Sequence, residues 1–362
     1  MKNALIIFGG RSAEHEVSIR SARNVIDALD KELYNPILVV ISRLGLWYFL
    51  EGENIPENMT EVNDQLSNAE ICTLMRRPLD TVIMTNSGKM LKIDIAFPVL
   101  HGPMGEDGTI QGMFEMMLVP YVGPGVLSSA IGMDKDVMKE LLALRKVPVV
   151  PLVVLGLDDA VPSFKDMCAR LNSDVLFVKP SVMGSAVGVS KVNTEAGFQD
   201  AVQQAFKYSF KILIEKAITG REVECSVLGN KDPKASCIGE IRPNHEFYNY
   251  EAKYLDPNGA DIIIPAQNFS SEIVEKVRDL AIKTFKAAEC KGMARVDFFV
   301  SDKDEIYVNE LNTIPGFTSI SMYPKMWEAS GITYTALITK LLELAEEEFA
   351  EKQNLRLVPD LV

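Results

Sequence analysis

The first third of the chain alternates apolar runs with segments whose apolar residues have helical spacing. Short apolar runs bounded by glycine and polar residues predict β-strands. Strands that alternate with helices are typical of a parallel sheet with crossover connections. We therefore predict a Rossmann-like parallel-sheet domain over residues 1–123. The expected strands cover 4–8, 36–41, 93–100 and 119–122, and the expected helices cover 17–29 and 109–118.

The pattern changes near residue 124, where short paired strands replace the alternation, and longer, hairpin-like strands follow. An amphipathic helix from Thr333 to about Glu351 closes the chain. We predict a central domain over 124–214 and a C-terminal domain over 215–362, which gives a three-lobed fold of mixed α/β and α+β class. The expected strands cover 149–154, 176–179, 187–191, 212–216, 222–228, 235–241, 293–300 and 306–311, with helices over 134–145 and 271–288.

Composition narrows the class of protein. The 362 residues carry 37 Lys and Arg against 50 Asp and Glu, a net charge of −13, which argues against a nucleic-acid binder. No apolar run reaches the ~18 residues that a membrane-spanning helix needs, so we expect no membrane association. The five cysteines are scattered and form no CxxC pair. Reduced thiols of this kind predict a cytoplasmic protein.

Residues 293–312 contain the most informative pattern. A four-residue hairpin loop at 302–305 would place Asp297 opposite Glu310 and Arg295 opposite Asn312. Because strand side chains alternate, all four would project from one face of the sheet. Two facing carboxylates and an amide oxygen make a hard-oxygen site that suits Mg²⁺. A salt-bridged surface patch around the arginine is the alternative, and this pattern by itself leaves both open.

Several charged and small residues follow predicted strands, where phosphate can be bound. Lys179 ends a strand and precedes a loop whose small residues, Gly184 to Ala186, let backbone amides approach a phosphate. Neither a Walker A loop nor a GxGxxG fingerprint occurs in the chain. Glu215-Lys216 also ends a predicted strand, and Lys135 lies at the start of a predicted helix. Each of these features alone is more typical of solvated charge or a plain turn than of a phosphate site.

The order of these features is more specific than any one of them. Over roughly residues 3–346 the chain closely resembles the D-alanine–D-alanine ligases, which are ATP-grasp enzymes. The segments that carry the resemblance are FGGRSAEHEVS, HGPMGEDGTIQG, GMDK, KPSVMGSAVGVSKV, EKAITGREVE, FYNYEAKY and RVD…NELNTIPGFTS. Two departures stand out: Ala186 replaces the second serine of many relatives, and the polar stretch 51–70 has no assigned role.

The resemblance implies an ATP-grasp fold and a role for individual residues. Glu16, Ser185 and Tyr254 would form a hydrogen-bonded trio near the first D-alanine, with His101 and Glu106 supporting its site. Arg295 and the Gly316 N–H would form the oxyanion site, and Ser321 would hold the second substrate's carboxylate. Asp297, Glu310 and Asn312 would bind two Mg²⁺ ions, for which Mn²⁺ can substitute. ATP would contact Lys135, Lys179, Glu215, Lys216, Ile218, Glu222, Phe247 and Lys253.

The implied reaction joins two D-alanine molecules through an acyl phosphate, for peptidoglycan precursor synthesis, in a homodimeric enzyme with a lid near residues 248–256. The intact EAKY sequence around Tyr254 favours a dipeptide product. A D-alanine–D-lactate or D-alanine–D-serine ligase is the alternative within the superfamily. A Rossmann-type redox or binding protein is the alternative outside it, although that class leaves the carboxylate hairpin unexplained.

Overall fold

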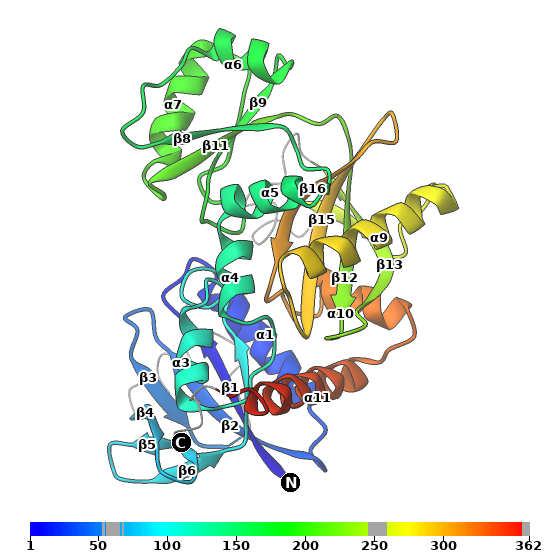
Figure 1. Ribbon diagram of the computed structural model, residues 1–362. Helices are drawn as coiled ribbons and strands as arrows, with labels where there is room; N and C mark the ends of the chain where they lie inside the picture. The colour runs from blue at the N-terminus through cyan, green and yellow to red at the C-terminus, as the bar shows by residue number, and fades with distance from the viewer. Residues whose placement is uncertain (53–54, 56–65, 67–68, 245–258, 357–362) are drawn as a thin grey trace, which may run out of the picture.

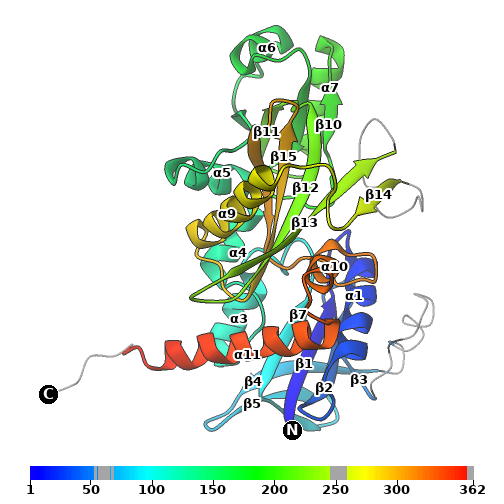
Figure 2. The same cartoon turned by 90° about the vertical axis from the view of Figure 1, so that its right-hand side faces the viewer.

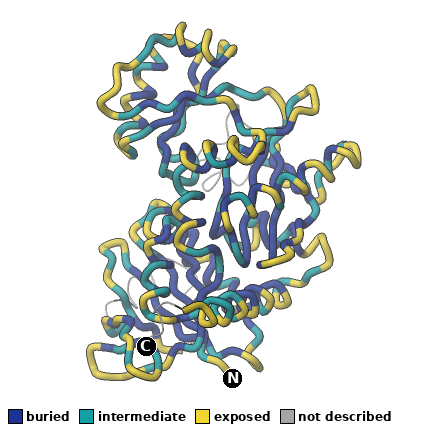
Figure 3. Tube along the Cα trace, viewed as in Figure 1, coloured by how far each residue is buried: buried dark blue, intermediate teal, exposed yellow. Residues whose placement is uncertain are grey.

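The computed structural model describes residues 1–52, 55, 66, 69–244 and 259–356. The expected roles of Phe247, Lys253 and Tyr254, and the expected lid, lie outside the described residues. Three sheets follow one another along the chain and form three lobes, as predicted (Figure 1). In each lobe the buried residues lie mainly where the helices pack on the sheet (Figure 3).

The N-terminal sheet has seven strands in the order β6-β5-β4-β3-β2-β1-β7. Only β1–β2 and β1–β7 are parallel, which confirms the expected parallel core, and the remaining pairs are antiparallel. The predicted strand at 119–122 forms only a bridge between Tyr121 and Ala96. The strands are β1 (Lys2–Gly9), β2 (Tyr34–Ile41), β3 (Trp47–Leu50), β4 (Glu70–Arg76), β5 (Thr81–Thr85), β6 (Met90–Ile93) and β7 (Ile95–Val99).

Helices cover both faces of this sheet. On one face, α1 (His15–Ala28) and α11 (Tyr334–Gln353) pack against β1 and β7 in one buried cluster. On the other face, α3 (Thr109–Met117) contributes Ile110 and Phe114 to a second cluster. The closing helix, which the sequence assigned to the C-terminal domain, therefore belongs to the N-terminal core (Figure 2). Its leucines have the spacing that buries one helix face.

The central sheet has four antiparallel strands in the order β10-β9-β11-β8, packed against two helices. The predicted boundary at 214/215 is wrong, because it falls inside β11, and the connection to the next sheet lies at 217–219. The elements are β8 (Leu152–Gly156), α6 (Phe164–Leu171), β9 (Leu176–Pro180), β10 (Ser190–Val192), α7 (Glu195–Ala205) and β11 (Lys211–Lys216).

The C-terminal sheet has five antiparallel strands in the order β14-β13-β12-β15-β16. Its apolar face packs against α9 (Ser271–Ala287) and α5 (Lys135–Leu144), which follows α4 (Val126–Met133). The opposite face carries polar residues toward the N-terminal lobe, with α10 (Met322–Ala329) at one end. The strands are β12 (Gly220–Leu228), β13 (Lys234–Pro243), β14 (Ala260–Ile263), β15 (Met293–Ser301) and β16 (Ile306–Asn312).

The β15–β16 hairpin has the predicted pairing at its acidic end and a different pairing at its loop. Asp297 lies opposite Glu310, and Arg295 opposite Asn312. A four-residue loop would pair Ile306 with Ser301. Near the loop, however, Ile306 pairs with Val300. A bulge between the two regions absorbs this one-residue difference. The expected register of the carboxylates is confirmed, whereas the expected loop geometry is wrong.

Candidate active site

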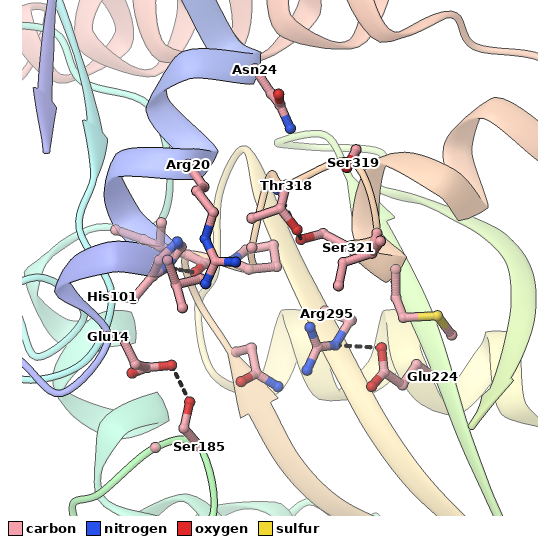
Figure 4. A pocket seen from close by; sticks show the side chains of 18 of the residues that line it. Glu14, Arg20, Asn24, His101, Ser185, Glu224, Arg295, Thr318, Ser319 and Ser321 are labelled. Atoms are coloured by element: carbon pink, nitrogen blue, oxygen red, sulfur yellow. Dashed lines mark hydrogen bonds and ion pairs between the residues drawn. The ribbon is translucent and has the colours of Figure 1, made fainter. Parts of the chain in front are cut away.

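Two cavities lie between the lobes and meet at Glu310. One, of about 470 Å³, is lined by α1, the loop at 101–106, the polar face of the C-terminal sheet and the segment 314–322 (Figure 4). The other, of about 700 Å³, lies between the central and C-terminal sheets and is lined by lysines and apolar residues. Glu310 lines both cavities. We call the first the small cavity and the second the large cavity.

Glu14, not Glu16, contacts the glycine-rich loop. The Ser185 hydroxyl donates a hydrogen bond to Glu14 Oε1, and both residues line the small cavity (Figure 4). Glu16 forms an ion pair with Arg43 outside it. Successive helical residues turn by about 100°, so a residue two positions along α1 faces away from the site. The expected contact of Glu16 with Ser185 is therefore wrong.

The loop 184–188 approaches Glu14 because its backbone adopts left-handed conformations. Ser185 has φ = 53° and Ala186 φ = 56°, which non-glycine residues seldom adopt. A Cβ atom at Gly184 would lie 3.1 Å from Glu14 Oε2, so a larger residue there crowds the carboxylate. Such locally costly conformations cluster at functional sites.

His101 connects the end of β7 to the segment 314–317. Its Nδ1 lies 3.1 Å from the Ile314 carbonyl oxygen and its Nε2 3.2 Å from Ser21 Oγ. Ser21 Oγ in turn accepts a hydrogen bond from the Phe317 N–H at 3.1 Å. A neutral ring with the proton on Nδ1 satisfies all three groups, and burial holds the pKa of His101 below its usual range. Both ring nitrogens therefore position the segment that carries Gly316.

Glu106 supports the same segment from the other side. Its carboxylate accepts hydrogen bonds from the Gly102 N–H at 2.7 Å and the Ile314 N–H at 3.1 Å. Burial, followed by the charge of Glu14, raises the pKa of Glu106 to about 8. Both predicted support residues thus line the small cavity and fix its wall.

The polar face of the C-terminal sheet presents Arg295 to the small cavity. Arg295 donates to Asp297 in a bidentate arrangement, from Nε to Oδ1 at 2.7 Å and from Nη2 to Oδ2 at 2.8 Å. Asn312 Nδ2 also donates to Asp297 Oδ2, at 2.9 Å. The Asp297 side chain is only 4% exposed and lines neither cavity.

Gly316 and Ser321 form a compact turn at the start of α10. Ser321 Oγ accepts a hydrogen bond from the Thr318 N–H at 2.9 Å, and a Cβ atom at Gly316 would lie 2.8 Å from that oxygen. Ser321 is also the N-cap residue of α10. The N-terminal turn of a helix has unpaired N–H groups and a positive dipole end, so this end of the small cavity favours a carboxylate.

Two buried lysines pair with one carboxylate at the large cavity, and a third lies beside Glu310. Glu215 binds Lys179 Nζ through Oε2 at 2.6 Å and Lys139 Nζ through Oε1. Burial works to raise the pKa of Glu215, but the two ammonium groups hold it below its usual value. Lys135 Nζ donates to the Met183 carbonyl at 2.6 Å and lies 3.7 Å from Glu310 Oε2.

The large cavity unites most of the residues expected at ATP. Lys135, Lys179, Glu215, Lys216, Ile218 and Glu222 all line it. Sequence reasoning missed Asn309, and it also missed Arg221 and Arg242, which clamp the buried carboxylate of Glu240. Two arginines near a glutamate on neighbouring strands give no distinctive sequence signal, because the same residues are common on exposed sheet surfaces.

Comparison with known proteins agrees with this geometry. Family models for the N-terminus and the C-terminus of D-ala D-ala ligase match residues 3–124 and 141–343. The chain is 45% identical over 356 residues to "D-alanine--D-alanine ligase A" of Salmonella typhimurium, covering 97% of each chain. The chain belongs to the D-alanine–D-alanine ligase family.

Solved structures of the family share the whole fold. The ligase from Coxiella burnetii superposes with a TM-score of 0.87 at 37% identity, covering 98% of both chains. The VanG D-Ala:D-Ser ligase from Enterococcus faecalis gives 0.81 at 33% identity, covering 95% of this chain and 99% of that one. The ligase from Bacillus anthracis complexed with ATP gives 0.73 at 27% identity, covering 97% of this chain and all of the other. The ATP-grasp fold is thereby confirmed.

The donor set on β15 and β16 fits a magnesium ion in a ligase of this family. Within the described ranges, no group of three or more His, Cys, Asp or Glu side chains has metal-binding geometry. Mg²⁺ does not need such a group, because it commonly takes one or two carboxylates and completes its shell with phosphate oxygens and water. Glu310 and Asn312 line the small cavity and offer two such oxygen ligands, whereas the neighbouring Asp297 accepts hydrogen bonds from Arg295 and Asn312. No helix in the described part of the chain combines the length and apolarity that crossing a bilayer requires.

Proposed function

We propose that this chain catalyses the ATP-dependent ligation of two D-alanine molecules to D-alanyl-D-alanine, for peptidoglycan precursor synthesis. One observation carries the proposal. The large cavity, which is lined by lysines, and the small cavity, which is lined by Arg295 and Gly316, meet at a single carboxylate, Glu310. A phosphoryl donor in the large cavity and an amino acid in the small cavity would come together there. The family of the chain supports the same reaction.

The first step activates a carboxylate. A carboxylate is a poor electrophile, so transfer of the ATP γ-phosphoryl group to one D-alanine creates an acyl phosphate with a good leaving group. Phosphoryl transfer depends mainly on positioning and on neutralising charge. Lys135 and Lys179 supply two ammonium groups at the large cavity. Magnesium, held by Asp297, Glu310 and Asn312, would neutralise further phosphate charge.

The second step forms the peptide bond. The amine of the second D-alanine attacks the acyl carbon, and negative charge develops on the carbonyl oxygen. Arg295 and the Gly316 N–H, which both line the small cavity, would donate hydrogen bonds to that oxygen. Ser321 and the N-terminal turn of α10 would hold the carboxylate of the second D-alanine. Phosphate then leaves as the tetrahedral intermediate collapses, and the attacking nitrogen loses one proton, which the departing phosphate can accept.

The Glu14–Ser185 pair would orient the first D-alanine. Glu14 would take the role near the ammonium group that the sequence assigned to Glu16, and this is supported by its position in the wall of the small cavity. Tyr254 would complete the trio from the segment outside the described residues. The backbone of Ala186, in the left-handed conformation, supplies the loop geometry without a hydroxyl group.

D-Serine is the second candidate for the attacking substrate, since a 33% identical relative is a D-Ala:D-Ser ligase. The EAKY sequence around Tyr254 supports D-alanine. The deciding measurement is ADP release with Mg²⁺ and D-alanine alone, with L-alanine, and with D-alanine plus D-lactate or D-serine. ADP release with D-alanine alone, and none with L-alanine, supports the proposal. NAD binding without any response to ATP would contradict it.

Two further properties belong to the proposal. All five cysteines are free thiols, which supports a cytoplasmic location, where thiols stay reduced. A homodimer is inferred from the family resemblance. Light scattering after size-exclusion chromatography distinguishes a monomer from a dimer, and a monomeric enzyme with full activity would contradict that part.

A further inference from the structure

Glu224 is a buried carboxylate in the small cavity to which neither the sequence nor the reaction outlined above assigns a role. It lies on β12, directly opposite Asp297 on β15. Both carboxylates therefore lie on the same face of the sheet, and their side chains are each 4% exposed. Like charges in directly opposed positions repel each other, so this placement needs a compensating cation.

Arg295 is that cation, and it is shared between the two acids. Its Nε lies 2.7 Å from Asp297 Oδ1 and 2.8 Å from Glu224 Oε2. Figure 4 shows the guanidinium beside Glu224 at the floor of the small cavity. Because Nε carries a single hydrogen, which points to Asp297, the contact with Glu224 is an ion pair ready to become a hydrogen bond after a small rotation.

The bidentate pair of Arg295 with Asp297 conflicts with metal ligation by Asp297. Three donor groups already occupy the Asp297 oxygens: Arg295 Nε, Arg295 Nη2 and Asn312 Nδ2. A carboxylate offers about four lone-pair sites, so a divalent cation at Asp297 competes with these three donors and repels the guanidinium. A shift of Arg295 away from Asp297 would relieve this competition, provided that the guanidinium stays in the cavity to serve as an oxyanion donor.

We propose that Glu224 is a positioning residue that holds Arg295 in the small cavity when Asp297 turns to a metal ion. This inference rests on the proposed function. Among the described residues, Glu224 and Asp297 are the carboxylates in ion-pair contact with the guanidinium, so Glu224 determines where Arg295 lies once Asp297 is engaged. Outer-sphere partners of this kind commonly change metal affinity or activity by about 10–100-fold.

The test compares Glu224→Gln and Glu224→Asp with the wild-type chain. Mn²⁺ binding is measured by electron paramagnetic resonance in the presence of ADP, and kcat is measured at saturating metal. Glu224→Gln keeps the shape but loses the charge, and Glu224→Asp keeps the charge but is one methylene shorter. We expect both variants to bind Mn²⁺ about 10-fold or more weakly and to lose about 10–100-fold in kcat. Glu115→Gln is the matched control, because Glu115 accepts hydrogen bonds from Tyr121 and Lys352 outside both cavities.

The two variants separate positioning from bulk charge. Wild-type Mn²⁺ affinity in Glu224→Asp would overturn the proposal, since charge alone would then explain the effect. Wild-type affinity and kcat in Glu224→Gln would also overturn it, while D-alanine-dependent ADP release by the wild-type chain would leave the proposed function standing. Equal melting temperatures establish that each variant is folded, and Glu224→Asp carries the test if Glu224→Gln does not fold.

Discussion

Lys179 Nζ donates a hydrogen bond to Asn309 Oδ1 at 3.1 Å, and Asn309 is the residue that the β15–β16 bulge leaves without a partner on β15. The bulge thus directs an amide into the large cavity next to a predicted phosphate-binding lysine. Bulges commonly direct side chains toward functional sites in this way. The same irregularity restores the pairing of Asp297 with Glu310, so it serves both cavities.

Asn309→Ala should weaken ATP binding and leave the binding of D-alanine unchanged. A hydrogen bond to a charged group contributes about 1.5–3 kcal/mol, so we expect KM for ATP to rise by about 10-fold or more. Steady-state kinetics, with ATP and D-alanine varied in turn, measures the two KM values separately. An equal rise in both KM values would indicate a general disturbance of the sheet and contradict the specific role.

Glu14→Gln and Glu16→Gln form a matched pair two residues apart on α1. Glu14 contacts Ser185 in the small cavity, whereas Glu16 forms a half-exposed pair with Arg43. We expect Glu14→Gln to lower kcat/KM for D-alanine by about 100-fold, the scale typical of a positioned polar group at a reacting centre. Glu16→Gln should stay within about threefold of wild type. The reverse order would restore the residue assignment made from the sequence.

Glu310→Gln should leave the fold intact and abolish Mg²⁺-dependent ADP formation. Glu310 lines both cavities and lies 3.7 Å from Lys135, so the substitution removes a proposed metal ligand at their junction. Circular dichroism checks the fold, and a coupled ADP assay checks turnover. Near-normal turnover would refute the metal assignment.

The stability of the chain should depend on pH through Glu106. Burial raises the pKa of Glu106 to about 8 in the folded state, against 4.5 as its ordinary value. Between these values the folded state binds a proton that the unfolded state has lost, so wild-type stability falls as pH rises from about 4.5 to about 8. Glu106→Gln removes this contribution. The free energy of unfolding of Glu106→Gln relative to wild type should therefore increase with pH across that window, by at most about 1.4 kcal/mol per pH unit.

Urea unfolding at pH 5, 6, 7 and 8 measures this difference. Glu106→Gln also loses one hydrogen bond from a backbone N–H. That loss changes the free energy of unfolding by the same amount at all four pH values, so it does not affect the dependence on pH. A difference that stays constant with pH would show that Glu106 is ionised in the folded protein.

Lys139→Met should destabilise the fold, because Lys139 is fully buried and pairs with Glu215. Removing the sole partner of a buried charge typically costs about 3–5 kcal/mol. Glu215 keeps Lys179 as a partner, so we expect Lys139→Met to cost less than that. Burial lowers the pKa of Lys139 from its ordinary 10.5 to about 8. Between these values the unfolded state binds a proton that the folded state has lost, so wild-type stability rises with pH and the penalty of Lys139→Met should grow from pH 8 to about pH 10.5. Lys276→Met is the control, because its exposed pair with Glu272 contributes about 0–1 kcal/mol. Equal melting temperatures for both variants would contradict the prediction.

The sequence by itself determined the elements and the chemistry of the site. Apolar periodicity marked β12, β13, β15 and β16, because a strand or helix that buries one face must repeat its apolar residues with the period of its backbone. The carboxylates of the hairpin were found because strand side chains alternate. The order of the motifs identified the family, whose members share the whole fold.

Only the tertiary structure decided which of two nearby acids faces the site. Glu14 and Glu16 differ in position by two residues, and the choice depends on where α1 begins and which face of it packs on the sheet. Tertiary packing likewise placed α11 under the N-terminal sheet and put Lys139 and Glu224 beside charged partners from distant segments. Contacts between distant segments depend on how several elements pack at once, whereas local periodicity records only the burial of each element. For that reason the apolar pattern predicted most strands of the central and C-terminal sheets but missed β3 to β6 and β14, and the assignment of the site acid fell two residues away.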